Sequence, residues 1–167
     1  MQLNSIFEDY FKEESDVHTD EVIWEEDPIP FKEFVHSPLH MNFPPYSERQ
    51  MDVMDFMFGD EPKKIFENEH SLAILAFGKG SGKDTLSVHA TCYVVYVLLC
   101  CKDPTALFKG VHADYLDILN VAYSYPQAIQ IFFAKLRNAV KDWTWLKNKY
   151  KYVDSGKSVK DDRKYES

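Results

Sequence analysis

The sequence predicts an α/β domain: a parallel β-sheet flanked by helices and incomplete at its C-terminal side. Two apolar runs of strand length, residues 72–77 and 115–122, alternate with two longer helical segments, 82–101 and 125–142. A loop rich in glycine and lysine separates the first run from the first long helix. With 167 residues, of which 45% are hydrophobic, the chain is long and apolar enough for one folded domain.

The N-terminal region, residues 1–42, combines an acidic helix with a proline-rich connector. Apolar side chains recur at helical spacing in residues 4–14, which predicts a short amphipathic helix. Proline cannot donate a backbone hydrogen bond, so we expect an extended connector over residues 27–46, which contain five prolines: Pro28, Pro30, Pro38, Pro44 and Pro45.

A helix of about three turns is predicted after Ser47. Ser47 and Gln50 have the spacing of a capping box, in which each side chain bonds to the other residue's backbone amide. Gly59 is a typical helix stop. The continuous apolar run Leu72–Phe77 then predicts a buried central strand, and Tyr115–Ala122 predicts a second strand.

Charge is distributed unevenly along a chain whose net charge is −8. Residues 1–33 contain eleven acidic and two basic side chains, whereas residues 135–167 contain ten basic and five acidic ones. The basic end suits either a nucleic-acid or partner surface or a solvated helix face, and composition alone favours the solvated face. The overall negative charge argues against a free-standing nucleic-acid binder.

No segment predicts export or membrane insertion. The longest apolar stretch, Ala90–Cys101, is too short to span a bilayer, and the N-terminus lacks the basic start of a signal peptide. Cys92, Cys100 and Cys101 form no CxxC pair and are odd in number, so we expect reduced, buried thiols. The six histidines offer no convincing set of metal ligands.

The sharpest local signal is the loop between the first predicted strand and the long helix. Its glycines let successive amides converge on one anion, and the helix N-terminus adds partial positive charge. This arrangement predicts a phosphate-binding loop of the P-loop NTPase type, whose nucleotide-binding candidates are Gly78, Lys79, Gly80, Ser81, Gly82, Lys83, Asp84 and Thr85. The strict pattern is broken twice, because Phe77 replaces its first glycine and Asp84 replaces its metal-binding hydroxyl.

The sequence offers two candidate ligands for the metal ion and does not decide between them. Asp84 would hold Mg²⁺ through its carboxylate, whereas Thr85 would supply the usual hydroxyl from a shifted helix start. A third possibility is that Asp84 only stabilises the helix N-terminus as an acidic residue of the first turn.

Over roughly Phe43 to Val140, the chain resembles the N-terminal part of the ATPase domain of terminase large subunits, the DNA-packaging motors of tailed bacteriophages. Three segments carry the resemblance in order. Pro45–Gln50 matches the family's adenine-binding segment, Lys79 stands four residues before Lys83 in the loop, and Ile118–Ala128 matches a later strand and helix.

The resemblance implies a RecA- or helicase-like sheet, ATP and Mg²⁺ as ligands, and ATP hydrolysis that drives DNA into a procapsid. It implies Lys83 and Lys79 as catalytic cations, and Tyr46 and Gln50 as adenine contacts. The glutamine amide suits a base edge, although a capping box alone also explains Gln50. The implied partners are double-stranded DNA, the portal and procapsid, and the small terminase subunit, with no membrane, in the host cytoplasm.

The acids that ATP hydrolysis requires have no counterpart in the sequence. An apolar strand ending in Asp-Glu is absent, so we expect residues 43–142 to be the N-terminal portion of an ATPase domain and residues 143–167 a basic polar tail of a truncated chain. The alternatives are a small-molecule P-loop kinase, for which only three arginines are present, and a non-catalytic nucleotide-binding fragment.

Overall fold

The computed structural model describes residues 22–67, 72–108, 116–121 and 128–150, together with Ser124 and Pro126. The helix predicted for residues 4–14 lies outside this part of the chain. The α-helices, in order, are α2 (Phe31–His36), α3 (Glu48–Phe58), α4 (Lys83–Cys100), α6 (Ala134–Asp142) and α7 (Thr144–Lys149). Shorter helical turns are η2 (Pro62–Lys64), η3 (Pro104–Phe108) and η4 (Ala128–Phe133).

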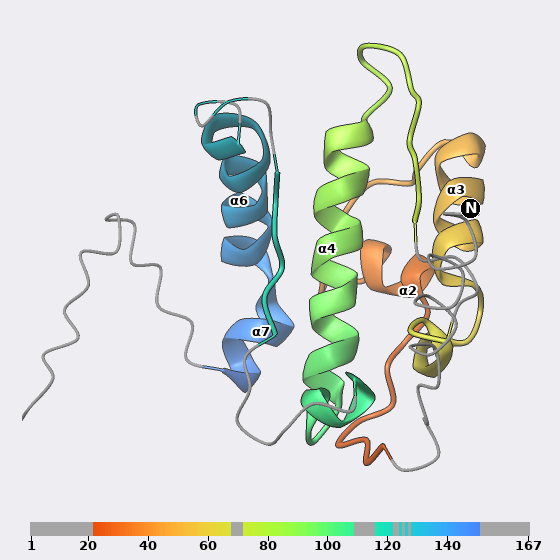
Figure 1. Cartoon of the computed structure of the whole chain (residues 1–167), viewed down its shortest axis with the longest axis vertical. Helices are drawn as coiled ribbons and strands as arrows, with labels where there is room; N and C mark the ends of the chain where they lie inside the picture. Colours follow the sequence, from red (N-terminus) through yellow and green to blue (C-terminus); the bar gives the residue numbers. More distant parts are fainter. Residues whose placement is uncertain are drawn as a thin grey trace, which may run out of the picture.

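Helix α4 is the centre of the fold. It has 18 residues, begins after the glycine-rich loop as predicted, and lies between α3 with α2 on one side and α6 on the other (Figure 1). Its sequence is apolar around most of its circumference, which is typical of a helix with neighbours on several sides. The predicted long helix 82–101 is therefore confirmed.

The hydrophobic core is largely aromatic. Phe34 of α2 lies with its ring centroid 5.3 Å from that of Tyr93, 5.1 Å from that of Tyr96 and 5.5 Å from that of Trp143. Such pairs add about 0.5–1.5 kcal/mol each beyond the area they bury. Trp143 is fully buried, although it stands at the start of the predicted basic tail. The division at residues 42 and 142 stays a prediction.

Helix α3 follows the prediction closely. It runs over 11 residues from Glu48, after Ser47, to Phe58, and Gly59 ends it with a backbone φ of 61°. The backbone amide of Ser47 donates to Oε1 of Gln50 at 3.0 Å, which is one half of the predicted capping box.

The extended connector predicted over residues 27–46 is wrong in its middle. Helix α2 forms between Pro30 and Pro38, because proline is tolerated at a helix start and no proline stands within the helix. The amide of Phe34 donates to the carbonyl of Pro30 at 2.9 Å, which closes the first turn. Phe31, Phe34 and Val35 are buried, so this segment contributes to the core.

The two predicted strands are extended but do not form a sheet within the described residues, so the parallel sheet is not confirmed. The described β-pairing is a single antiparallel bridge between Trp24 and Cys101. Segments 72–77 and 116–121 both run upward in Figure 1, and the helix that follows each segment runs downward. The strand–helix–strand–helix order is therefore present without a hydrogen-bonded ladder.

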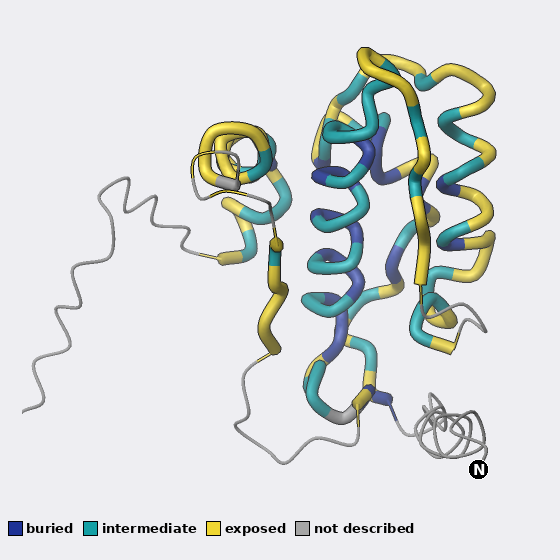
Figure 2. The backbone as a smooth tube through the Cα atoms, turned by 45° about the horizontal axis from the view of Figure 1, so that its top comes forward, coloured by how far each residue is buried: buried dark blue, intermediate teal, exposed yellow. Residues whose placement is uncertain are grey.

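The burial predicted for Leu72–Phe77 is wrong in this structure, and residues 116–121 are also open to solvent. Most of their residues are exposed (Figure 2), with exposed fractions of 79% for Ile74 and 84% for Leu119. The physical reason is that an apolar strand becomes buried only when neighbouring strands cover its edges and faces. The helix predicted for residues 125–142 is confirmed over its described part, as a π-helical turn, η4, followed by α6.

All three cysteines are free and buried, as predicted. Burial raises the pKa of Cys92, Cys100 and Cys101 to about 12, so the thiols stay protonated and unreactive at neutral pH. No described helix has the length and apolar character needed to cross a bilayer.

Candidate functional site

The glycine-rich loop joins the extended segment 72–77 to the first turn of α4. Gly80 and Gly82 adopt φ values of 82° and 81°, in the left-handed region that favours glycine. Gly82 is the N-cap residue of α4. Within the described residues, the amides of Gly80, Gly82 and Lys83 have no hydrogen-bond acceptor in the chain. Donors of this kind at a helix N-terminus suit a phosphate group.

Both loop lysines are available for an anionic ligand. Lys79 is exposed and Lys83 is half-buried in the first turn of α4. In the part of the chain that the structure describes, neither forms an ion pair. The side-chain oxygen of Ser81 is buried without a hydrogen-bond partner among the described residues. The loop therefore carries unpaired cations and an unpaired hydroxyl side by side.

Gln50 connects helix α3 to this loop. Its Nε2 donates to the carbonyl oxygen of Ser81 at 2.9 Å, while its Oε1 accepts from the backbone amide and the hydroxyl of Ser47. A Cβ atom at Gly82 would lie 2.8 Å from Nε2 of Gln50. The amide predicted to contact adenine is thus beside the phosphate loop, but its hydrogen bonds go to the chain itself.

Tyr46 lies deeper than Gln50, in the aromatic core. Its ring is parallel to that of Phe31 at a centroid distance of 6.4 Å, and its hydroxyl is hydrogen-bonded to Nδ1 of His89. Burial raises the pKa of Tyr46 and lowers that of His89 to about 4. The tyrosine hydroxyl has no other acceptor among the described residues, so it donates to the neutral imidazole. In this structure, the hydroxyl of Tyr46 is therefore engaged by His89 and not by a ligand.

Asp84 and Thr85 are placed differently in the first turn of α4. The Asp84 carboxylate is 3.4 Å from Nζ of Lys135 on α6, and both side chains are 46% exposed. Thr85 lines a pocket between α4 and α6. The carboxylate therefore has a cationic partner, whereas Thr85 borders the pocket.

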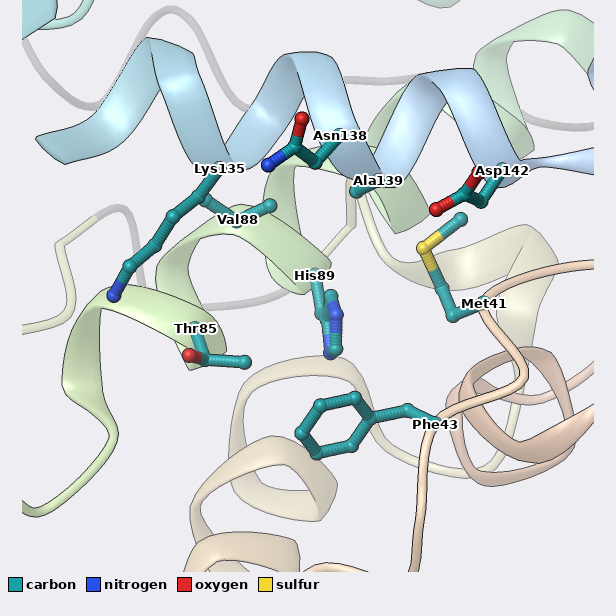
Figure 3. Close-up of a pocket in the computed structure, with 9 residues that line it drawn as sticks. All are labelled: Met41, Phe43, Thr85, Val88, His89, Lys135, Asn138, Ala139 and Asp142. Carbon is teal, nitrogen blue, oxygen red and sulfur yellow. The ribbon is translucent and has the colours of Figure 1, made fainter. Parts of the chain in front are cut away.

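Two hollows flank the loop. The first, of about 280 Å³, is lined by Ser47, Arg49, Gln50, Phe77 and Ser81. The second, of about 310 Å³, lies on the α6 side and includes Thr85, His89 and Lys135 (Figure 3). Among the described residues no group of three or more His, Cys, Asp or Glu side chains could hold a metal ion.

Comparison with protein families matches residues 7–166 to a family described as "Uncharacterized protein MJ0330, N-terminal P-loop domain". The chain belongs to this family of P-loop domains. Searches of curated proteins and of solved structures give no match. The match covers the phosphate loop and α4, and the P-loop class predicted from the glycines and lysines is therefore confirmed. The family description names no packaging motor.

Sequence reasoning missed His89, Lys135, Asn138 and Asp142 as pocket residues. Helical spacing indicates part of the pocket, because it shows which residues share one side of a helix. Thr85 and His89 are one turn apart on α4. Lys135, Asn138 and Asp142 share one side of α6. Spacing alone does not tell which helices are neighbours, so the pocket required the tertiary structure.

Proposed function

We propose that this P-loop domain binds ATP together with Mg²⁺. The observation that carries the proposal is the loop itself: two left-handed glycines place the free amides of Gly80, Gly82 and Lys83 at the start of an 18-residue helix. Lys83 would contact the β- and γ-phosphates, and Lys79 would add a second cation near the γ-phosphate. The unpaired hydroxyl of Ser81 offers a further contact.

The base of the nucleotide would enter the hollow beside Arg49, Gln50 and Phe77. Arg49 and Phe77 offer planar surfaces on which a purine can stack. Gln50 would contact the base only by exchanging its hydrogen bond to the Ser81 carbonyl for one to the ligand. Tyr46 would support this region from the core and would not contact the base.

Thr85 is the favoured metal ligand. The carboxylate of Asp84 already has Lys135 as a partner, and a second negative charge beside a triphosphate would be repelled. The hydroxyl of Thr85 adds no such repulsion. Mg²⁺, held by Thr85 and the phosphates, supplies charge neutralisation when bound. Thr85→Ala is expected to abolish the Mg²⁺ dependence of ATP binding, which Asp84→Ala retains; the reverse result would assign the metal to Asp84.

Titration calorimetry with Mg-ATP tests the binding site. Lys83→Ala is expected to weaken binding by about 1.5–3 kcal/mol, roughly ten- to hundredfold, because a lysine–phosphate contact is charge-assisted. The control is Lys141→Ala. Lys141 is an exposed lysine near the end of α6, so its loss removes one positive charge away from the loop. Circular dichroism establishes that each variant is folded. Equal affinities for wild type and Lys83→Ala would refute the site.

We also propose that segments 72–77 and 116–121 serve as strands of a parallel sheet. Their apolar side chains, common direction and following helices support this assignment. Amide hydrogen exchange provides the test. Protection of both segments in solution would indicate paired strands, whereas exchange at the rate of an exposed loop would contradict the proposal.

The packaging-motor function rests on the sequence motifs alone, as do its DNA, portal, procapsid and small-subunit partners. The Pro45–Gln50 segment, Lys79 and the Ile118–Ala128 region support it. Its test is ATP hydrolysis by the protein with and without double-stranded DNA. Stimulation by DNA would support a motor, whereas phosphate transfer to a small molecule would support the kinase alternative.

A further inference from the structure

The pocket on the α6 side of the loop shares Thr85 with the proposed nucleotide site, and its other lining residues have no role there. It measures about 310 Å³ and lies between α4, α6 and the segment that contains Met41 and Phe43 (Figure 3). Thr85, in the first turn of α4, is where this pocket meets the phosphate loop. Its other polar groups come from α6 and from the second turn of α4.

The pocket is electrically bipolar. Lys135 and Asp142, both on α6, lie at opposite ends of it, with Asn138 between them (Figure 3). Seven residues of helix separate the backbones of Lys135 and Asp142 along the axis by about 10 Å. In the close-up, the Lys135 side chain extends toward Thr85, while Asp142 lies beside Met41. At one end of the pocket, Lys135 forms a half-exposed ion pair with the Asp84 carboxylate, 3.4 Å away, and at the other end Asp142 supplies a negative charge.

A buried histidine lines the middle of the pocket (Figure 3). His89 is only 6% exposed, and its Nδ1 accepts the hydroxyl of Tyr46. The ring proton is consequently on Nε2, and burial, which lowers the pKa of His89 to about 4, keeps the imidazole neutral at pH 7. Thr85 and His89 stand one helical turn apart on α4, so both line the same pocket.

The walls between the two ends are apolar. Val88 and Ala139 form the sides, and Phe43 packs edge-to-face on His89 at a centroid distance of 4.7 Å. A helix packed only for stability turns apolar residues toward its neighbour, whereas α6 lines this pocket with a lysine, an asparagine and an aspartate. Charges at both ends of an apolar passage match a ligand with charges at both of its ends.

We propose that this pocket binds a small ω-amino carboxylate, a molecule with a carboxylate at one end, an ammonium group at the other and methylenes between them. The carboxylate replaces Asp84 as the partner of Lys135, an exchange that costs little because that ion pair is half exposed, and it also accepts from Thr85 and Nε2 of His89. The ammonium group donates to Asp142, and the methylenes pack on Val88, Phe43 and Ala139. The site requires no nucleotide, and its test is made without one because Thr85 is also the proposed metal ligand.

The test uses 6-aminohexanoate as the probe and the ¹⁵N-labelled 167-residue chain, without nucleotide. We expect saturable chemical-shift changes centred on Thr85, His89 and Asn138. Hexanoate and hexylamine, which each lack one charged end, should bind at least about fivefold more weakly, since each loses a charge-assisted contact.

Matched variants assign the two ends. Lys135→Met and Asp142→Asn should each weaken 6-aminohexanoate at least about fivefold, whereas Lys141→Met, also on α6, and Asp55→Asn, on exposed α3 surface, should leave it unchanged. Lys135→Met should also narrow the difference in affinity between 6-aminohexanoate and hexylamine, because the carboxylate loses its charged donor. Absence of binding, equal binding of the one-ended analogues by wild type, or insensitivity to both pocket variants would overturn the proposal.

Discussion

Substituting alanine at the three loop glycines should produce a graded series of stability losses, because their surroundings differ. Gly78 has no left-handed φ, and no atom lies within 4 Å of the position that a Cβ would take there. Gly80 has a φ of 82° but equally open space, and Gly82 combines a φ of 81° with Nε2 of Gln50 at 2.8 Å from the added Cβ. The series separates backbone strain from steric contact.

The expected magnitudes follow from these differences. Gly78→Ala should change the free energy of unfolding by less than about 0.5 kcal/mol or raise it slightly, through the lower entropy of the unfolded chain. Left-handed strain costs about 1–2 kcal/mol, partly offset by that entropy, so Gly80→Ala should cost about 1 kcal/mol. Gly82→Ala should cost about 2 kcal/mol, since Gln50 must also give up its 2.9 Å bond to Ser81.

Urea unfolding followed by tryptophan fluorescence measures these values, with buried Trp143 as a probe of the core. The decisive variant is Gly82→Ala combined with Gln50→Ala, which removes the amide that the new methyl group meets. In that background the cost of Gly82→Ala should fall to that of Gly80→Ala, a coupling of about 1 kcal/mol. Equal costs at all three glycines, or no coupling with Gln50, would refute the reasoning.

Four further predictions concern protonation, burial, surface charge and turnover. Burial lowers the pKa of His40 and His89 from 6.5 to about 4, so the unfolded chain binds more protons between these pH values. The free energy of unfolding should therefore fall, by on the order of 1–3 kcal/mol per histidine, as pH drops through this window; equal urea midpoints at pH 5 and pH 7.5 would contradict it. Tyr46→Phe should lower the free energy of unfolding by about 1–3 kcal/mol, because it leaves Nδ1 of His89 without its partner; an unchanged urea midpoint would argue against that hydrogen bond. Asp84→Asn should cost less than about 1 kcal/mol in thermal or urea unfolding, since its ion pair with Lys135 is half exposed, and a larger loss would mean that the carboxylate has a structural role. The 167-residue chain should release phosphate from saturating Mg-ATP more slowly than about 1 per second, because its sequence lacks the acids for metal binding and water activation; faster release would point to Glu48 or Asp84.

Features set by neighbouring residues could be predicted from the sequence. The limits of α3 follow from Ser47 and Gly59, and the start of α4 follows from Gly82, because caps and left-handed glycines act within a few residues. The buried thiols also followed from their positions in an apolar helix. The phosphate loop belongs to the same class, since its chemistry is local to one turn and one helix start.

Features that depend on distant segments could not be predicted in the same way. The apolar run Leu72–Phe77 has the composition of a buried strand, yet its burial depends on neighbours that no local pattern specifies. Helix α2 was not predicted, because the five prolines of the surrounding segment indicated an extended chain. The seven residues between Pro30 and Pro38 contain no proline and are enough for a short helix. The pocket residues His89 and Lys135 come from helices whose packing is a tertiary property.

Gln50 shows why a local motif and a functional motif need not be alternatives. Its Oε1 accepts from the backbone amide and hydroxyl of Ser47 at the start of α3, while its Nε2 donates to the carbonyl of Ser81 in the loop. One side chain therefore fixes a helix N-terminus and the backbone of the phosphate loop at once. A base that drew Nε2 away would release the Ser81 carbonyl, so base contact and loop geometry are coupled through this amide. Gln50→Ala should consequently weaken binding of inorganic triphosphate as well as ATP, whereas a residue that only reads the base would affect ATP alone.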